Sequence, residues 1–246
     1  VGATENAMLA ACGCQGKTVI TGAAREPEIV DLQDFLRKTG VHITGAGTSR
    51  ICIQGGVSQD RVEHTVIGDR MAGAAGGSIE LTGLEPEHLA CVLAVLEEAG
   101  CRITQEKDQI TLHSSGQLHG VRPVRTAPYP GFPTDAQAVL MAALAGGEGS
   151  TMFVENIFDS RYHHVDELRR MGARIQTDGR VAVVTGAGRL HGADVHGTDL
   201  RGAAALVVAA LGAKGVSRVS GLAHLERGYD SFGDTLSSLG ARIQTL

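Results

Sequence analysis

The sequence predicts an α/β fold made of repeated units, in which sheets enclose a set of buried helices. Three observations support this prediction. One pattern of a helix end, a glycine and a strand start recurs four times along the 246 residues. The helices expected at the start of the units are apolar nearly all round, which is typical of helices buried on every side. The chain also contains 34 glycines and many alanines, which allow such helices to pack closely.

The repeated pattern is eight residues long and begins with a leucine near the end of a helix. Its copies start 60, 72 and 68 residues apart, at 36–43, 96–103, 168–175 and 236–243. The glycine in each copy is expected to end the helix, because glycine readily adopts the left-handed conformation found there. A second glycine stands 19 to 21 residues before each leucine and precedes another strand: Gly16, Gly77, Gly149 and Gly215. Spacing this regular indicates one repeated structural unit.

Each unit is expected to run helix, strand, helix, strand and final strand. The first helices, expected inside, include the apolar stretches 7–11, 139–145 and 203–211. The second helices are amphipathic, as Ile29, Leu32 and Leu36 show by their helical spacing, and should cover the outside. The final strands are expected at 51–54, 109–113 and 180–185.

The second unit is shorter than the others. Only residues 71–77 separate Arg70 from Ser78, where the other units have room for a full helix. Either this copy carries a deletion, or residues are missing from the sequence, which starts at Val1 without a methionine. We therefore expect a chain break or a mobile segment near Met71, in a sequence that is part of a longer gene product.

Composition excludes several classes of function. The net charge is −5 and there is no run of lysines or arginines, so nucleic acid is not expected as a partner. No apolar run reaches the length of a membrane span, so no membrane partner is expected either.

Metal binding is not expected. The five cysteines form no C-x-x-C pair and are interpreted as small, reduced thiols of a cytosolic protein. The spacing of Cys12 and Cys14 fits no usual zinc pattern. His163 and His164 are adjacent, so on a helix they point in different directions and are interpreted as surface or core residues.

Residues 125–135 form the most distinctive segment. Three of the six prolines lie within it, and each fixes its own φ and keeps the preceding residue out of the helical region. The segment is therefore expected to be a stiff, extended loop that ends at Thr134 and Asp135, directly before the helical run 136–145. Two interpretations of Asp135 remain open: a helix N-cap, which aspartate commonly provides, or a functional carboxylate placed by the loop.

Charged residues recur in register with the repeats. Asp199, like Asp135, follows a threonine and opens a buried helix, and Asp69–Arg70 holds a similar place in the second unit. Arg201 follows two residues after Asp199. Further arginines stand near the starts of second helices, where a cation opposes the helix dipole: Arg25, Arg161 and Arg227. Either nearby carboxylates pair with these arginines, or the arginines converge on a phosphate or carboxylate.

Four motifs together carry a family resemblance: Ala-Arg-Glu-Pro-Glu at 24–28, Pro-Gly-Phe-Pro-Thr-Asp at 130–135, Thr-Asp-Leu-Arg at 198–201 and Glu-Arg-Gly-Tyr at 226–229. With them the chain resembles the UDP-N-acetylglucosamine 1-carboxyvinyltransferases, a family of enolpyruvyl transferases. The resemblance runs over the whole chain and corresponds to about the last three-fifths of the family. The related shikimate-pathway enolpyruvyl transferases share the fold but not these motifs.

The resemblance implies transfer of the enolpyruvyl group from phosphoenolpyruvate to the 3′-hydroxyl of UDP-N-acetylglucosamine, with release of phosphate. This is the first committed step of peptidoglycan synthesis, so it serves cell wall biogenesis, cell shape, the cell cycle and cell division. A cytoplasmic transferase is implied, with its two substrates as partners and with no metal or other cofactor.

The resemblance also implies a domain organisation. The family's fold consists of two inside-out α/β barrels, each of three repeats with sheets around the helices, and its active site lies in the cleft between them. Residues 1–56 would form the last repeat of the first domain. Residues 57–246 would form the second domain of three repeats, the first of them shortened near 71–77.

Residue roles are implied position by position. Asp135 resembles the candidate base beside the acceptor hydroxyl, and Asp199 resembles the second acidic residue at the reacting carbons. Arg201 and Arg227 resemble the arginines that bind phosphoenolpyruvate. Further substrate-binding positions are a residue that supports the closed cleft, a sugar-nucleotide contact, a backbone segment near the diphosphate and another arginine: Arg161, Ile157, Val1–Gly2 and Arg70 in that order.

The chain departs from the family in ways that bear on activity. The family's N-terminal lysine and asparagine are missing, and so is the mobile loop that carries its cysteine acid. His163 and Asp166 stand where the family usually has methionine and proline, which we expect to be tolerated. The missing loop predicts that residues 1–246 alone are inactive. The alternative function is that of a truncated, non-catalytic relative with a ligand-binding or interaction role.

Overall fold

The computed structural model describes residues 1–55, 77–227, 229, 232–238 and 240–244. The chain divides into two compact units: Val1–Arg70 with Pro128–Gly131, and Met71–Ala127 with Phe132–Leu246. The predicted domain boundary between residues 56 and 57 lies outside the described residues and stays a prediction. The same is true of the break expected near Met71.

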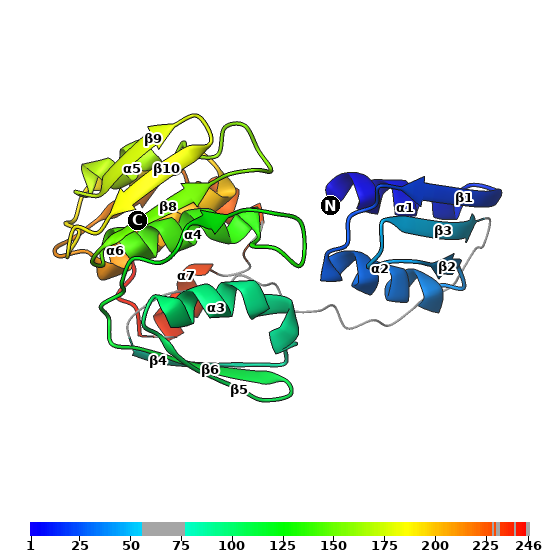
Figure 1. The fold of residues 1–246 in the computed structure, drawn as a ribbon, viewed down its shortest axis with the longest axis horizontal. Coiled ribbons are helices and arrows are strands. Elements are labelled where there is room, and N and C mark those ends of the chain that lie inside the picture. The colour runs from blue at the N-terminus through cyan, green and yellow to red at the C-terminus, as the bar shows by residue number, and fades with distance from the viewer. Residues whose placement is uncertain (56–76, 228, 230–231, 239, 245–246) are drawn as a thin grey trace. The chain divides into compact units, whose positions relative to one another are not determined.

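The first unit contains one repeat, in which three strands form an antiparallel sheet in the order β1-β3-β2 and two helices pack on it (Figure 1). Its core is made of aliphatic side chains such as Met8, Ile29, Ile51 and Ile53, which are fully buried. The elements are α1 (Gly2–Gly13), β1 (Gly16–Thr21), α2 (Pro27–Lys38), β2 (His42–Thr44) and β3 (Arg50–Gly55).

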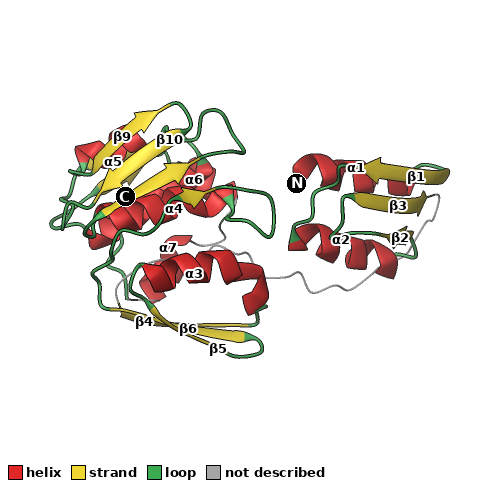
Figure 2. Ribbon diagram, viewed as in Figure 1, coloured by secondary structure: helices red, strands yellow, loops and turns green. Residues whose placement is uncertain are grey.

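The second unit contains the remaining repeats (Figure 2). A sheet in the order β4-β6-β5 carries α3, a four-stranded sheet has the order β7-β8-β10-β9, and β11 pairs in parallel with β12. Its described elements are β4 (Gly77–Thr82), η1 (Pro86–Leu89), α3 (Ala90–Glu98), β5 (Arg102–Gln105), β6 (Gln109–Ser114), β7 (Val124–Arg125), α4 (Thr134–Ala145), β8 (Ser150–Val154), α5 (Val165–Arg170), β9 (Arg174–Asp178), β10 (Val181–Thr185), β11 (Asp194–His196), α6 (Leu200–Gly212), β12 (Arg218–Ser220), η2 (Leu222–Arg227) and α7 (Phe232–Ser238).

The predicted α/β fold of repeated units is confirmed. In three of the units the first, third and second strands lie in that order, as β1-β3-β2, β4-β6-β5 and β8-β10-β9. The glycines expected to end helices all adopt a positive φ, between 85° and 101°: Gly40, Gly100, Gly172 and Gly240. This conformation is strained for other residues, so the pattern requires glycine at these positions.

The inner helices α4 and α6 pack directly against each other, as their apolar sequences predicted. Eight residues of α4 and six of α6 are buried, most of them alanine or leucine. Their small side chains let the two helices approach closely, and the surrounding sheets complete one continuous core. Within the described part of the chain, no helix is long and apolar enough to cross a membrane.

Two expectations were wrong. The helix around 7–11 is not buried on every side of its unit: α1 buries Thr4, Met8 and Ala11, while Leu9 is 51% exposed. The described residues of the first unit include one inner helix, α1, and no second inner helix covers the side of α1 that carries Leu9. The strand predicted at 241–243 is also missing. Within the described part of that unit there is no third strand with which residues 241–243 could form backbone hydrogen bonds.

Candidate functional site

Asp135 is the second residue of α4, and the structure decides against its being a helix cap. Pro133 occupies the N-cap, and no side chain caps the helix. The preceding loop folds back on itself where the Ala127 amide donates to the Phe132 carbonyl at 3.0 Å. The loop thus leads into the helix start at Asp135, whose two carboxylate oxygens contact residues from further along the chain.

Two arginines bind this carboxylate. Arg161 Nη2 donates to Asp135 Oδ1 at 2.5 Å, and Arg201 Nη2 donates to Oδ2 at 2.9 Å. The two guanidinium groups are largely buried, whereas the Asp135 side chain is 44% exposed. Arg161 and Arg201 thus converge, but on a carboxylate of the protein itself, which is the pairing interpretation. Convergence on the phosphate or carboxylate of a ligand stays a prediction. The cluster carries one net positive charge and remains open to solvent at Asp135.

Tyr229 fixes the second of these arginines. Its hydroxyl accepts a hydrogen bond from Arg201 Nη1 at 3.0 Å, and the Arg201 guanidinium lies 5.7 Å from the ring centroid. Burial by itself would lower the pKa of Arg201, but the hydrogen bond and charge of Asp135 outweigh it and raise that pKa. Arg201 is thus held as a permanent cation by two side chains from distant segments of the unit, Asp135 and Tyr229.

Asp199 is the N-cap of α6. Its Oδ1 accepts hydrogen bonds from the backbone amides of Arg201 at 3.0 Å and Gly202 at 2.8 Å. Its other oxygen, Oδ2, lies 3.5 Å from Thr198 Oγ1. The cap connects the two acidic positions, because the helix that Asp199 starts is the one that places the Arg201 side chain on Asp135.

His164 lies buried beside this cap, whereas its neighbour His163 is exposed. Burial lowers the pKa of His164 to about 4, although the charge of Asp199 acts in the opposite direction. Its Nε2 atom finds no hydrogen-bond partner among the described residues. The imidazole is therefore neutral at ordinary pH. No group of three metal-ligating side chains occurs in the described ranges.

The other predicted positions differ in how far the structure describes them. Ile157 is 38% exposed and precedes Phe158, whose ring lies 4.9 Å from the Arg161 guanidinium. Val1 and Gly2 are exposed at the start of α1 in the first unit. Arg227 ends η2, and its side chain lies outside what is described, as does all of Arg70.

Sequence reasoning missed Tyr229, the role of His164 and the buried Glu155. Glu155 is 1% exposed and directly follows β8. A charged residue at the end of an apolar strand was a usable signal, because a buried carboxylate needs several hydrogen-bond donors. Tyr229 lies in the motif at 226–229, but no role could be assigned to it, since its contact with Arg201 joins residues far apart in sequence.

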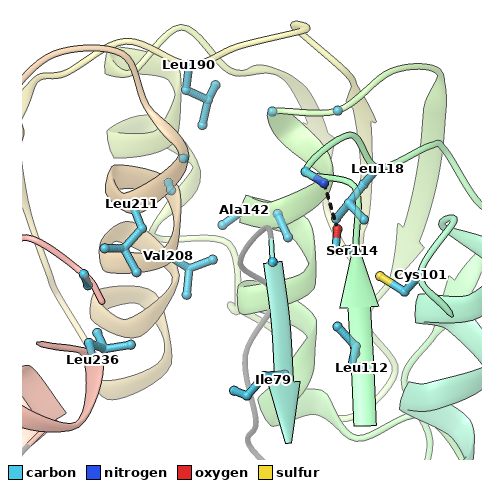
Figure 3. A pocket seen from close by; sticks show the side chains of 18 of the residues that line it. Ile79, Cys101, Leu112, Ser114, Leu118, Ala142, Leu190, Val208, Leu211 and Leu236 are labelled. Carbon is cyan, nitrogen blue, oxygen red and sulfur yellow. Dashed lines mark hydrogen bonds between the residues drawn. The ribbon is translucent and has the colours of Figure 1, made fainter. Parts of the chain in front are cut away.

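An apolar cavity of about 380 Å³ in the second unit lies apart from these residues. Figure 3 shows Ala142 of α4 and Val208 of α6 facing it, with Ile79 and Leu112 from the β4-β6-β5 sheet. None of the predicted site residues lines it. Its lining offers few polar groups, so the candidate site is the cluster around Asp135 rather than this cavity.

Known proteins resemble the chain over almost its full length. Residues 1–236 match the family described as EPSP synthase (3-phosphoshikimate 1-carboxyvinyltransferase). UDP-N-acetylglucosamine 1-carboxyvinyltransferase 1 of Caldanaerobacter subterraneus is 44% identical over 251 residues, covering 99% of this chain and 60% of the relative. The enzyme of that name from Afipia carboxidovorans is 45% identical over 256 residues, covering 100% and 59%. The chain therefore spans about three-fifths of the length of these relatives.

Solved structures show the same fold. The enolpyruvyl transferase NikO from Streptomyces tendae superposes with a TM-score of 0.83 at 29% identity, covering 99% of this chain and 60% of that one. EPSP synthase from Acinetobacter baumannii has a TM-score of 0.69 at 20% identity, covering 97% and 60%, and supports the fold alone. The resemblance seen in the motifs is thus confirmed, and the chain belongs to the EPSP synthase family of enolpyruvyl transferases.

Proposed function

We propose that the protein transfers the enolpyruvyl group of phosphoenolpyruvate to the 3′-hydroxyl of UDP-N-acetylglucosamine and releases phosphate. The observation that supports this proposal is the Asp135 carboxylate held by Arg161 and Arg201 at the end of the 130–135 motif. The relatives at 44% and 45% identity are named for this reaction. It would be a cytoplasmic step, the first committed one of peptidoglycan synthesis, and so would serve cell wall biogenesis and cell division.

Asp135 would take the proton of the acceptor hydroxyl as that oxygen bonds to the central carbon of phosphoenolpyruvate and the methylene carbon is protonated. Cleavage of the C–O bond to phosphate, with loss of a proton from the new methyl group, would then restore the double bond. Asp199 would act as the second acidic group at the reacting carbons. Arg201 and Arg227 would hold the phosphate and carboxylate of phosphoenolpyruvate, and Arg161 would keep Asp135 in place. The sugar nucleotide would contact three further positions: Ile157, Val1–Gly2 and Arg70.

The charges of the cluster suit these roles. A base must reach the acceptor hydroxyl, and the Asp135 side chain is 44% exposed and so accessible. Fixed cations must balance a substrate with several negative charges, and Arg201 is held by both Asp135 and Tyr229 before any ligand arrives. Each charge-assisted hydrogen bond to phosphate is worth ~1.5–3 kcal/mol. A preorganised Arg201 would therefore supply both affinity and orientation.

The test is phosphate release by the full natural polypeptide. With phosphoenolpyruvate present, UDP-N-acetylglucosamine should support release, whereas 3-phosphoshikimate as the acceptor should not. Release with 3-phosphoshikimate alone would contradict the proposed acceptor. The polypeptide of residues 1–246 by itself is expected to release none. Binding of UDP-N-acetylglucosamine without release by the full polypeptide would favour the alternative, a non-catalytic ligand-binding relative.

A further inference from the structure

Glu155 accepts four hydrogen bonds although it is almost completely buried. Its side chain is 1% exposed and lies directly after β8. All the groups around it donate, so the carboxylate acts only as an acceptor, as an ionised carboxylate does. The donors are Thr126 Oγ1 at 2.9 Å, Thr134 Oγ1 at 2.9 Å, the Ile157 amide at 2.8 Å and the Phe158 amide at 3.1 Å.

The two oxygens serve different segments of the chain. Oε2 binds the hydroxyl of Thr134, which is the neighbour of Asp135 and the first residue of α4. Oε1 binds the Thr126 hydroxyl and the amides of Ile157 and Phe158, at the start of the loop that leads to Arg161. The Glu155 side chain thus bonds to residues close in sequence to both partners of the Asp135–Arg161 ion pair.

Additional bonds tie the same two segments together. The Asn156 amide donates to Thr126 Oγ1 at 2.8 Å, and Asn156 Nδ2 donates to the Thr126 carbonyl at 3.0 Å. A buried carboxylate is costly unless its oxygens accept hydrogen bonds. Because the two oxygens of Glu155 accept hydrogen bonds from two different segments, Glu155 can fix the distance between those segments.

We propose that Glu155 is a positioning residue, which sets where the Asp135 carboxylate and the Arg161 guanidinium meet. It touches neither substrate nor reacting atoms and acts through Thr134 and through the backbone of Ile157 and Phe158. The inference rests on the proposed function only where turnover is the readout. Because displacement of a catalytic group by about 1 Å can lower turnover by about 10², the contribution of Glu155 should be visible in kinetics.

The first experiment removes one hydroxyl and uses a matched control. Thr134→Val deletes the bond to Glu155 Oε2. Thr151→Val deletes a side-chain hydrogen bond of similar length, because Thr151 Oγ1 accepts from the Val121 amide at 2.8 Å, away from the ion pair. Both variants should lower the urea midpoint by similar amounts. Turnover of the full polypeptide should fall at least about tenfold in Thr134→Val and stay near the wild-type value in Thr151→Val.

The second experiment separates position from charge. In Glu155→Gln the amide can accept through its oxygen and donate to the Thr134 hydroxyl, so the four contacts survive without the negative charge. Turnover should therefore stay near the wild-type value, whereas Glu155→Leu should lose it. If Glu155→Gln is as inactive as Glu155→Leu, the charge matters rather than the position, and the proposal is wrong.

A third readout does not depend on turnover. The NMR signal of the Arg161 Nε–H group should shift in Thr134→Val and remain unchanged in Thr151→Val. If the wild-type protein transfers no enolpyruvyl group, the proposed function fails, and this signal still decides the role of Glu155. Equal effects of the two threonine variants on the Arg161 signal would overturn the positioning role, whatever the activity.

Discussion

Replacing His164 by phenylalanine should make the fold less sensitive to acid. The imidazole is 2% exposed, and burial lowers its pKa from 6.5 to about 4. Among the groups facing it, the charge of Asp199 and a hydrogen bond to the Arg161 backbone raise this pKa, while the charges of Arg161 and His163 lower it. Phenylalanine is a somewhat larger planar ring that does not titrate, so the variant removes the protonation and keeps an aromatic side chain at this position.

The sign and the size follow from linkage. The folded pKa lies below the unfolded one, so between pH 6.5 and about 4 the unfolded chain carries a proton at His164 that the folded chain does not. Stability is therefore complete above pH 6.5 and is lost as the pH falls towards 4. At ~1.4 kcal/mol per pKa unit, the full loss is about 3 kcal/mol, of which roughly 2 to 3 kcal/mol appears between pH 7.5 and 4.5.

Urea unfolding at pH 7.5 and 4.5 measures this loss. His163→Phe is the control, because His163 is the exposed neighbour on the same segment and its charge is the smallest of the named contributions to the pKa of His164. Carboxylates elsewhere titrate equally in both variants and cancel in the comparison. The wild type and His163→Phe should lose roughly 2 to 3 kcal/mol more than His164→Phe on acidification. Equal losses in the two phenylalanine variants would refute the view that His164 is buried as a neutral imidazole.

Three further predictions concern the full polypeptide. Asp135→Asn should spare nucleotide binding and lower turnover by about 10² or more, because the base is lost; near-normal turnover would show that Asp135 is not the base. In Gly202→Ala the added Cβ would lie 3.0 Å from Asp199 Oδ2. This contact should disturb the Asp199 cap that positions Arg201, so turnover should fall. The free energy of unfolding should change little, because alanine favours a helix over glycine by ~1 kcal/mol and this offsets the close contact. Tyr229→Phe loses the 3.0 Å bond to Arg201 and should raise KM for phosphoenolpyruvate roughly tenfold; an unchanged KM would contradict the role of Arg201 in binding.

The repeats could be predicted because their signals are local. Glycine after each second helix and apolar runs in the inner helices act over a few residues, and both are seen in the structure at Gly40, Gly100, Gly172 and Gly240 and in α4 and α6. Gly40 and Gly172 end their helices with φ of 85° and 91°. The exposed side of α1 at Leu9 shows the limit of such signals, because its apolar sequence is the same kind as that of the buried α4.

The candidate site could be identified only from the sequence and the tertiary structure together. Sequence alone identified Asp135, Asp199 and the arginines as a set, through their repeated positions and the motifs around them. It could not decide whether Asp135 caps a helix or which carboxylate Arg201 meets, since the residues of that ion pair are 66 positions apart. Such a contact depends on how helices of different repeats pack, and local rules reach only three or four residues along a helix.

His163 and His164 make the same point within one dipeptide. The amino-acid sequence alone determined the repeated α/β architecture, the family and the types of residue that lie at the helix starts. Only the tertiary structure decided that one histidine is buried beside Asp199 and the other is exposed, and that Glu155 holds two loops at once. Burial and long-range hydrogen bonding are properties of the packed chain, because each depends on neighbours that folding brings together from distant positions.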